Sequence, residues 1–290
     1  MTYPPEIGIV DGMLGFPRAD PVRNYDFLQP QLRDAGSAAM AFPAGYMFTD
    51  VPNRLEEGED PVAVTLAAMD RTGIALGLVG LGPTSAERAL TDHPDRFAAT
   101  LEVDPNDITG AVRRIREAHD QWAIKAVTSF PAGCNPQVPV SDRRYYPIYQ
   151  TCVDLDIPAV VNAGIAGPRV PSACQDVMHF DQVCYDFPEL RLVMRHGAEP
   201  WADLAVKLML KWPGLFYMTS AFAPKYYPRE VLDYANTRGS AKVIYAGYYP
   251  MGLTLDRIVA ELADLPLRDN VWARFLRENA LEVFKLEPGG

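Results

Sequence analysis

Short apolar runs rich in β-branched residues alternate with longer segments of helical period along almost the whole chain, and this alternation restricts the fold more than any other feature. It is typical of βαβ units, in which helices connect parallel strands. Eight runs are predicted to be strands: residues 6–12, 74–82, 96–104, 123–131, 157–164, 191–197, 215–220 and 242–249. Eight strand–helix pairs in about 250 residues are the scale of a (β/α)8 TIM barrel, so we predict an α/β chain of this architecture.

Helical segments separate these strands, and several begin with Asp, Ser or Thr followed by a carboxylate, as helix N-caps do. A further helix is predicted near the end of the sequence, in RDNVWARFLRENALEVF. Since no Gly/Ser-rich linker divides the sequence, we predict that residues 1–290 form one domain.

The segment of residues 13–60 breaks this rhythm. It follows the first strand, contains no convincing strand of its own, and combines several prolines and glycines with Phe16, Phe27, Phe42, Tyr46, Met47 and Phe48. Long segments of this kind are usually functional or contain short helices. Because the segment leaves from the carboxyl end of a strand, where barrel active sites lie, we predict an aromatic-rich lid over the pocket. A dimer interface is the alternative.

Charge and composition exclude several classes of partner. The net charge of -10 and pI near 4.9 argue against binding to nucleic acid or to an anionic membrane surface. No apolar run approaches the roughly 20 residues that span a bilayer, and MTYPPEIGIV lacks the pattern of a signal peptide, so we predict a cytoplasmic protein. The four cysteines form no CxxC motif, which argues against a zinc or redox centre, and Cys152 is predicted to be a core residue.

Residues at the carboxyl ends of the strands of a barrel converge on one pocket, so they are the candidates for chemistry. They are Asp11, Met13, Glu102, Asp104, Lys125, Ser129, Asn162, Arg195, His196, Thr219, Ser220 and Tyr248. Of the four histidines only His196 ends a strand, so the three ligands of a catalytic zinc site are not predicted. A hard-cation site formed by Asp11, Glu102 and Glu199 stays open on ligand chemistry.

Several stretches of the C-terminal half resemble a known family. HFDQVCYDFPELRLVMRHG, AFAPKYYP, NTRGSAKVIYAGYYPMG and FLRENALEVF are similar to sequences of the amidohydrolase-related (family 2) branch of the amidohydrolase superfamily. This branch includes decarboxylases such as aminocarboxymuconate semialdehyde decarboxylase and hydrolases such as the pyrone dicarboxylate lactonase. The resemblance implies the barrel fold, an enzyme and a homodimer or larger homo-oligomer, and it leaves the substrate open.

The metal site is where the sequence departs from this family. The resemblance implies an HxH pair at the end of the first strand, where this chain has Met13 and Gly15. It implies a histidine after the fifth strand and an aspartate after the eighth, where this chain has Asn162 and Tyr248. Only the histidine after the sixth strand, His196, remains. Since each lost ligand weakens a metal site, we predict no metal and no other cofactor.

The remaining polar residues suggest roles in catalysis. His196 is the predicted general acid or base, because imidazole titrates near neutrality, and Asp11 is predicted to orient His196 or a water molecule. Tyr248 and Asn162 are predicted to donate hydrogen bonds to an oxyanion. Arg195 or Lys125 could pair with a substrate anion. For Arg195 an outward orientation is equally expected, because the side chains of a strand alternate between its faces and His196 is assigned inward. The predicted substrate-binding residues are Met13, Phe16, Tyr46, Lys125, Ser129, Arg195, Glu199, Ser220 and Tyr249.

The sequence therefore predicts a metal-independent enzyme that hydrolyses an ester, lactone, thioester or activated carbon–carbon bond of a small, apolar carbonyl compound. Two alternatives stay open. One is a non-hydrolytic decarboxylase of the same superfamily, in which His196 protonates the carbanion. The other is a pseudoenzyme that has kept the pocket only to bind a ligand.

Overall fold

The computed structural model describes residues 6–19, 22–40, 44–47 and 54–287. It contains one sheet of eight strands in the order β1-β2-β3-β4-β5-β6-β7-β8, and each strand pairs in parallel with the next. The strands are β1 (Ile9–Leu14), β2 (Ile74–Gly80), β3 (Phe97–Glu102), β4 (Ala126–Ser129), β5 (Ala159–Asn162), β6 (Leu192–Arg195), β7 (Leu215–Met218) and β8 (Val243–Ile244). This is the predicted (β/α)8 barrel.

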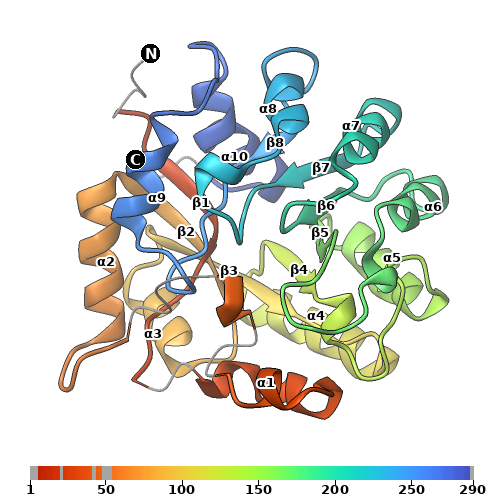
Figure 1. Cartoon of the computed structure of the whole chain (residues 1–290), viewed down its shortest axis with the longest axis horizontal. Helices are drawn as coiled ribbons and strands as arrows, with labels where there is room; N and C mark the ends of the chain where they lie inside the picture. Colours follow the sequence, from red (N-terminus) through yellow and green to blue (C-terminus); the bar gives the residue numbers. More distant parts are fainter. Residues whose placement is uncertain (1–5, 20–21, 41–43, 48–53, 288–290) are drawn as a thin grey trace.

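Helices surround the strands in an outer ring (Figure 1). They are α2 (Pro61–Thr72), α3 (Thr84–Asp92), α4 (Ile108–Trp122), α5 (Tyr146–Asp154), α6 (Met178–Asp186), α7 (Ala202–Lys211), α8 (Arg229–Ala235) and α9 (Leu255–Leu262). The predicted N-caps are confirmed where Asp60, Asp107 and Thr254 accept hydrogen bonds from backbone N–H groups of the first turn. None of the described helices has both the length and the apolar character needed to cross a bilayer.

Shorter elements connect this framework. The segment after β1 contains η1 (Val22–Gln31), α1 (Ala35–Ala38) and η2 (Gly45–Met47). Five further short helices are η3 (Pro131–Gly133), η4 (Arg143–Tyr145), η5 (Ala173–Gln175), η6 (Pro224–Tyr226) and the π-helical turn η7 (Arg274–Glu278), which leads into α10 (Asn279–Phe284).

The apolar core forms two layers because the side chains of a strand alternate between its faces. Outward-facing residues such as Ile9, Leu101 and Met194 pack against the ring of helices, and Cys152 lies in this layer as predicted. Inward-facing residues such as Val10 and Val193 fill the barrel and pack against Phe284 of α10. Since α10 and its neighbours contact the amino-terminal ends of the strands, this end of the barrel is closed. The opposite end is open for a pocket.

The boundary between β8 and β1 differs from the other seven strand boundaries. Two backbone hydrogen bonds cross it, from Gly12 N to Tyr245 O at 3.2 Å and from Gly15 N to Tyr249 O at 2.9 Å. The regular part of β8 is limited to Val243–Ile244, whereas the sequence predicted a strand over 242–249. The chain beyond β8 therefore reaches the mouth of the barrel as irregular backbone.

Candidate active site

A cavity of about 440 Å³ lies at the carboxyl ends of the strands. Its described lining comes from the carboxyl ends of all eight strands or the residues that follow them, and from the segment after β1. This volume is within the range of small-molecule binding pockets. The cavity is therefore the candidate active site.

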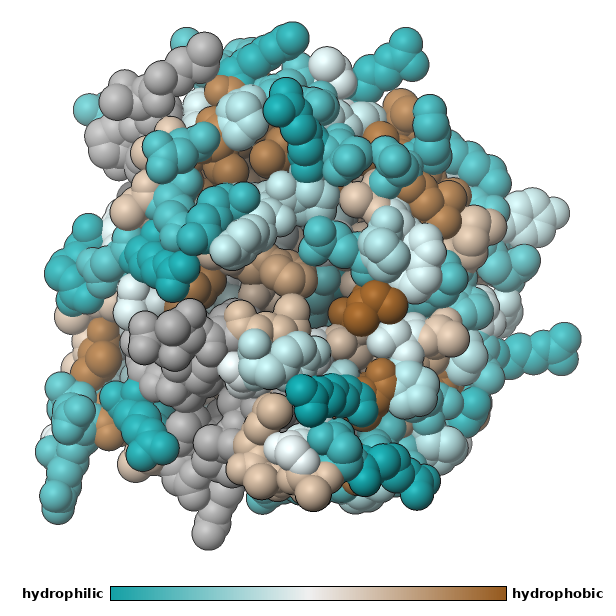
Figure 2. Space-filling view, in the orientation of Figure 1, coloured by the Kyte–Doolittle hydropathy of each residue, from teal (hydrophilic) through white to brown (hydrophobic). Residues whose placement is uncertain are grey.

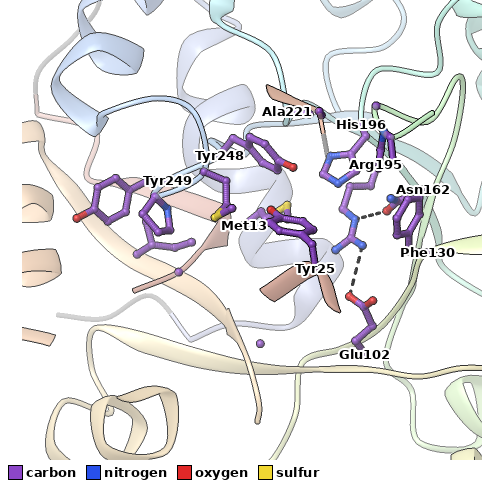
Figure 3. Close-up of a pocket in the computed structure, with 18 of the residues that line it drawn as sticks. Met13, Tyr25, Glu102, Phe130, Asn162, Arg195, His196, Ala221, Tyr248 and Tyr249 are labelled. Atoms are coloured by element: carbon purple, nitrogen blue, oxygen red, sulfur yellow. Dashed lines mark hydrogen bonds and ion pairs between the residues drawn. The ribbon is translucent and has the colours of Figure 1, made fainter. Parts of the chain in front are cut away.

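Arg195, the last residue of β6, supplies the positive charge of this cavity. Its side chain is 7% exposed, its Nε donates to Asn162 Oδ1 at 2.7 Å, and its Nη2 lies 3.8 Å from Glu102 Oε2 (Figure 3). Burial lowers the pKa of Arg195, with Glu102 acting in the opposite direction, but a guanidinium group remains charged in proteins. Among the described residues, the hydrogen bond of this side chain is the one from Nε to Asn162. The Nη groups face the cavity, and their N–H groups are available to a ligand.

His196 follows Arg195 and lines the same cavity. Its φ of +72° is unusual for a residue with a side chain, and this turn of the backbone lets two consecutive side chains reach one pocket. Strain of this kind is often found at functional sites. Burial and the charge of Arg195 lower the pKa of His196 well below its usual value, so the imidazole is neutral at neutral pH.

Ser220 forms hydrogen bonds with His196. Its Oγ lies 2.7 Å from Nδ1 of His196 and accepts a hydrogen bond from the backbone N–H of the same residue at 3.2 Å. This contact leaves Nε2 as the nitrogen that can serve a ligand. Ser220 is therefore a partner of the histidine, whereas the sequence predicted that it would contact substrate.

Tyr248 packs edge-on against His196, with ring centroids 5.5 Å apart at an interplanar angle of 82°. Its hydroxyl shares a hydrogen bond with Tyr25, a residue of η1. Burial raises the pKa of Tyr248, while Arg195 and Tyr25 act in the opposite direction. Tyr248 is therefore a neutral phenol at physiological pH and can donate a hydrogen bond.

Apolar side chains form most of the remaining wall. Phe16, Phe130 and Phe222 lie in the lining, and Phe27, Met47 and Ile165 are the exposed members of the same group at its rim. The face shown in Figure 2 is mostly hydrophilic, with hydrophobic side chains near its centre. A ligand of this cavity therefore needs a largely apolar body.

The structure brings together seven of the predicted site residues and leaves six outside the lining. Those in the lining are Met13, Phe16, Asn162, Arg195, His196, Tyr248 and Tyr249, although Tyr249 points away from the group around Arg195 in Figure 3. Those outside are Asp11, Tyr46, Lys125, Ser129, Glu199 and Ser220. The predicted site therefore includes residues that line the cavity together with His196, but it also includes residues that lie outside the lining.

Two predictions about direction are wrong. Lys125 precedes β4, so it lies at the amino-terminal end of the barrel, where its Nζ is 3.5 Å from the carbonyl oxygen of Lys285. The predicted strand 123–131 began too early, because Ala123 is the left-handed C-cap of α4 and β4 starts only at Ala126. The expectation that Arg195 might point outward is also wrong: it points inward, and the positive φ of the next residue keeps His196 there as well.

The other residues outside the lining have different partners. Asp11 faces the layer between barrel and helices, where its Oδ1 accepts from Met13 N and Gly247 N. Ser129 donates to Val103 O and contacts the Tyr145 hydroxyl. Tyr46 is exposed and donates to Gly167 O, which places it above the cavity. Glu199 is half-buried beyond the His196 turn, and burial raises its pKa.

The segment of residues 13–60 supplies functional side chains that the sequence did not identify. Tyr25 and Arg18 line the cavity along with the predicted Phe16. The predicted lid residues Phe42 and Phe48 lie outside the described residues. No motif marks Tyr25, and only its place in an aromatic-rich segment after the first strand could have indicated it. A lid that closes over the cavity stays a prediction.

The side chains present do not fit a divalent metal ion. Met13, Gly15 and Tyr248 stand where the family resemblance implies ligands, and Asn162 Oδ1 already accepts from Arg195. Among the described residues no group of three or more His, Cys, Asp or Glu side chains could hold a metal ion. The alternative set fails as well, because Asp11 faces the helices while Glu102 is the ion-pair partner of Arg195. The guanidinium itself would repel a cation at this place.

The fold is similar to those of several solved structures. An uncharacterised TIM-barrel protein from Bordetella bronchiseptica shares 20% identity at a TM-score of 0.73, with 96% of this chain and 98% of that chain covered. A 5-carboxyvanillate decarboxylase from Novosphingobium aromaticivorans, complexed with manganese and 4-hydroxy-3-methoxy-5-nitrobenzoic acid, shares 15% at 0.69, with 98% of both chains covered. A probable 2-pyrone-4,6-dicarboxylic acid hydrolase from Acinetobacter baumannii, with citric acid bound, shares 12% at 0.61, covering 96% and 99%.

These identities establish the fold and leave the activity open. A search among curated proteins finds no match to this sequence. The family model described as Amidohydrolase matches residues 31–286, which is most of the chain. The comparison confirms the family that the C-terminal sequence resembles. This chain belongs to the amidohydrolase family.

Proposed function

We propose that this protein is a metal-independent hydrolase that acts on an ester, lactone, thioester or activated carbon–carbon bond of a largely apolar carbonyl compound. His196 is its general acid and base, and Tyr248 and Asn162 donate hydrogen bonds to the oxyanion. The observation that carries this proposal is the position of Arg195. A fixed positive charge, a neutral imidazole and a neutral phenol face one apolar cavity whose residues do not fit a metal ion.

Substrate binding would combine the apolar wall with the guanidinium. The Nη groups of Arg195 form a planar fork, which matches the two oxygens of a carboxylate. The names of two structural neighbours, a 5-carboxyvanillate decarboxylase and a probable pyrone dicarboxylic acid hydrolase, are consistent with a carboxylate ligand for this chain as well. The proposed substrate therefore carries an anionic group in addition to its reactive carbonyl.

Binding of this anion would prepare His196 for proton transfer. The positive charge of Arg195 is one of the two causes that lower the pKa of His196. A carboxylate paired with Arg195 offsets this charge, so the pKa of the imidazole rises when substrate binds. Nε2 of His196 then accepts a proton from the attacking water and returns it to the leaving group.

The negative charge that develops on the carbonyl oxygen needs donors that are already in place. Because Asn162 Oδ1 accepts from Arg195, its Nδ2 is the donor that remains, and no described residue accepts from it. The hydroxyl of Tyr248 is the second donor. Both are neutral, so the oxyanion would be stabilised by hydrogen bonds and by the nearby charge of Arg195.

Hydrolysis is favoured over decarboxylation by the same guanidinium. A carboxylate held in a bidentate pair is stabilised in the ground state, which opposes loss of that group as carbon dioxide. The decarboxylase alternative would therefore need a second carboxylate on the substrate, directed toward His196. It is consistent with the decarboxylase among the structural neighbours.

Product analysis in water labelled with heavy oxygen tests the proposal. A panel of aryl esters, lactones and thioesters, each with and without a carboxylate, is incubated with the wild-type protein and with H196N. We expect solvent oxygen in the product, a preference for the carboxylate-bearing compounds, and loss of turnover in H196N. Release of carbon dioxide without solvent oxygen would support the decarboxylase instead, and binding without any product would support a ligand-binding pseudoenzyme.

A further inference from the structure

The strand boundary between β8 and β1 carries two residues of the cavity. Met13 belongs to β1 and Tyr248 follows β8, and both face the pocket (Figure 3). The two backbone hydrogen bonds across this boundary, Gly12 to Tyr245 and Gly15 to Tyr249, lie on either side of the region that contains these residues. Between these two hydrogen bonds, a side chain also joins the two backbones.

Asp11 supplies that interaction. Its Oδ1 accepts a hydrogen bond from Met13 N at 2.9 Å, on its own strand, and from Gly247 N at 2.8 Å, on the opposite side of the boundary. The side chain is fully buried, so these two hydrogen bonds do not compete with water. When Asp11 is ionised, these are hydrogen bonds to a charged acceptor, which are roughly twice as strong as those between neutral groups. One carboxyl oxygen thus joins the backbones that present Met13 and Tyr248.

The neighbouring glycine makes room for this carboxyl group. A Cβ atom at Gly247 would lie 2.7 Å from Asp11 Oδ2, closer than such atoms approach in real structures. It would also lie 3.3 Å from the Tyr245 hydroxyl, so these polar groups share the space beside the glycine. An alanine at this position would push the carboxyl group away from the Gly247 N–H.

The second carboxyl oxygen lies in a polar space between the barrel and the helices. Among the described residues Asp11 Oδ2 has no hydrogen-bond partner, and its atom is fully buried. The titratable groups that face this region are Tyr245, which follows β8, Tyr227 next to η6 and Glu261 of α9. Burial raises the pKa of Asp11 to about 7, and the hydrogen bonds from Gly247 and Met13 act in the opposite direction.

We propose that Asp11 is the positioning residue of the active site, because it clamps the end of β1 to the residues after β8 and so fixes Met13 and Tyr248 at the mouth of the barrel. Asp11 does not touch the cavity. It acts through the backbone N–H groups of Met13 and Gly247, and Tyr248 follows Gly247 directly. The catalytic part of this inference rests on the proposed role of Tyr248 as an oxyanion donor.

The clamp is tested first without any substrate, by recording the amide signals of Met13 and Gly247 in isotope-labelled wild-type protein from about pH 4 to about pH 9. Because both N–H groups share one acceptor, we expect their signals to move together with a single midpoint near pH 7, set by the raised pKa of Asp11. In D11N, which keeps a carbonyl oxygen as acceptor, this titration should vanish. Separate midpoints for the two amides, or amide signals of Met13 and Gly247 that are the same in D11A as in the wild-type protein, would overturn the clamp.

Three further variants separate positioning from general damage. D11A removes the acceptor, and G247A keeps the aspartate but displaces it. D233N removes an exposed carboxylate of α8 and serves as the matched control. On the substrate that the product analysis identifies, we expect D11A and G247A to lower kcat by about 100-fold with little change in KM, as misplacement of a catalytic group does. D11N should keep kcat within a few-fold of the wild type.

The two proposals fail in distinguishable ways. If no substrate is turned over, the proposed function is wrong, whereas the amide titration still decides whether Asp11 joins the two backbones. If D11A keeps wild-type kcat while the shared titration is present, the clamp exists but does not position Tyr248, and the inference is overturned. A loss of kcat in D11N equal to that in D11A would also overturn it, because an amide oxygen should replace the acceptor.

Discussion

Arg195 and Asn162 are joined by a hydrogen bond of 2.7 Å from Nε to Oδ1, in a cavity where the guanidinium is almost fully buried. Because arginine can only donate, this bond fixes the orientation of the amide and directs its Nδ2 toward other acceptors. This hydrogen bond thus orients two groups: the Arg195 guanidinium, which can pair with an anion, and the Asn162 amide N–H, which can donate to a carbonyl oxygen. Five predictions test this site and its surroundings.

Replacement of Arg195 should weaken the binding of carboxylates selectively. We expect R195M to lose about 2 kcal/mol of affinity, or about 30-fold, for benzoate as an aromatic carboxylate probe, since a hydrogen bond to a charged group is lost. Titration calorimetry measures the effect, and the neutral methyl ester of the same compound is the control. R195K should recover only part of the affinity, because lysine lacks the fork. Equal losses for acid and ester would contradict the proposed role.

His196 should give different pH dependences for the free and the bound enzyme. Burial and Arg195 hold the pKa of His196 well below its usual value, so kcat/KM should stay constant down to a pH below the ordinary histidine range. In kcat, the acid limb should lie at a higher pH, because bound anion offsets the charge of Arg195. Rate measurements across the acid range check this difference. Coincident limbs for the two parameters would rule out coupling between substrate anion and imidazole.

The Tyr25–Tyr248 pair should affect catalysis more than binding. Removal of the Tyr248 hydroxyl in Y248F is expected to lower kcat by about 100-fold, the usual effect of losing one oxyanion donor, with a small change in KM. Y25F should have a weaker effect in the same direction, because Tyr25 acts through Tyr248. Phe16→Leu, a change in the apolar wall, serves as the comparison and should mainly raise KM. If Y248F retains full kcat, Tyr248 is only a packing residue.

Asp11 should make the folded state less stable as the pH rises. Burial raises its pKa from 3.8, the value of an exposed aspartate, to about 7 in the folded protein, so the folded state binds the extra proton between these values. The free energy of unfolding should then fall by roughly 3 kcal/mol between pH 4 and pH 7, counting Asp11 alone. Denaturant titrations of the wild type and D11N measure this difference. An identical pH dependence in both would show that Asp11 has an ordinary pKa.

Removal of divalent metals should not change activity. The donor set of the cavity does not fit a metal ion, so protein treated with chelator and then freed of it should keep its full rate, and added manganese should not raise it. Elemental analysis of the purified protein accompanies the rate measurement. Stoichiometric metal whose removal abolishes turnover would refute the metal-independent mechanism.

The barrel could be predicted from the sequence because the two patterns that indicate it, hydrophobic periodicity and helix N-caps, each involve residues that are close together in the chain. Periodicity and N-caps such as Asp60 and Thr254 located every strand and helix of the ring. The ends of the strands were harder to predict. The backbone at His196 and Ala221 adopts a positive φ, and the sequence gives no indication of such a conformation in residues other than glycine. This uncertainty explains the error at Arg195, whereas Lys125 was misplaced because β4 starts after it, at Ala126.

The site could be predicted where a simple rule holds, namely that an inward-facing side chain at the carboxyl end of a strand, or just after it, faces the pocket. Asn162 and Tyr248 were placed correctly by this rule. The rule failed for Asp11, because β1 changes register between Asp11 and Leu14, so that Met13 points inward although Asp11, two residues earlier, points outward. Tyr25 was missed since its contact with Tyr248 joins residues that are far apart in the sequence.

The cavity is assembled from both ends of the chain, since its lining extends from Met13 to Met251. A partly synthesised polypeptide therefore cannot contain the binding site, which forms only when β8 reaches β1. A compound that binds there recognises the finished barrel alone, and mass action would shift the folding equilibrium toward it. Libraries of small carboxylates can thus be screened through the rise in melting temperature that they cause, before any reaction is known.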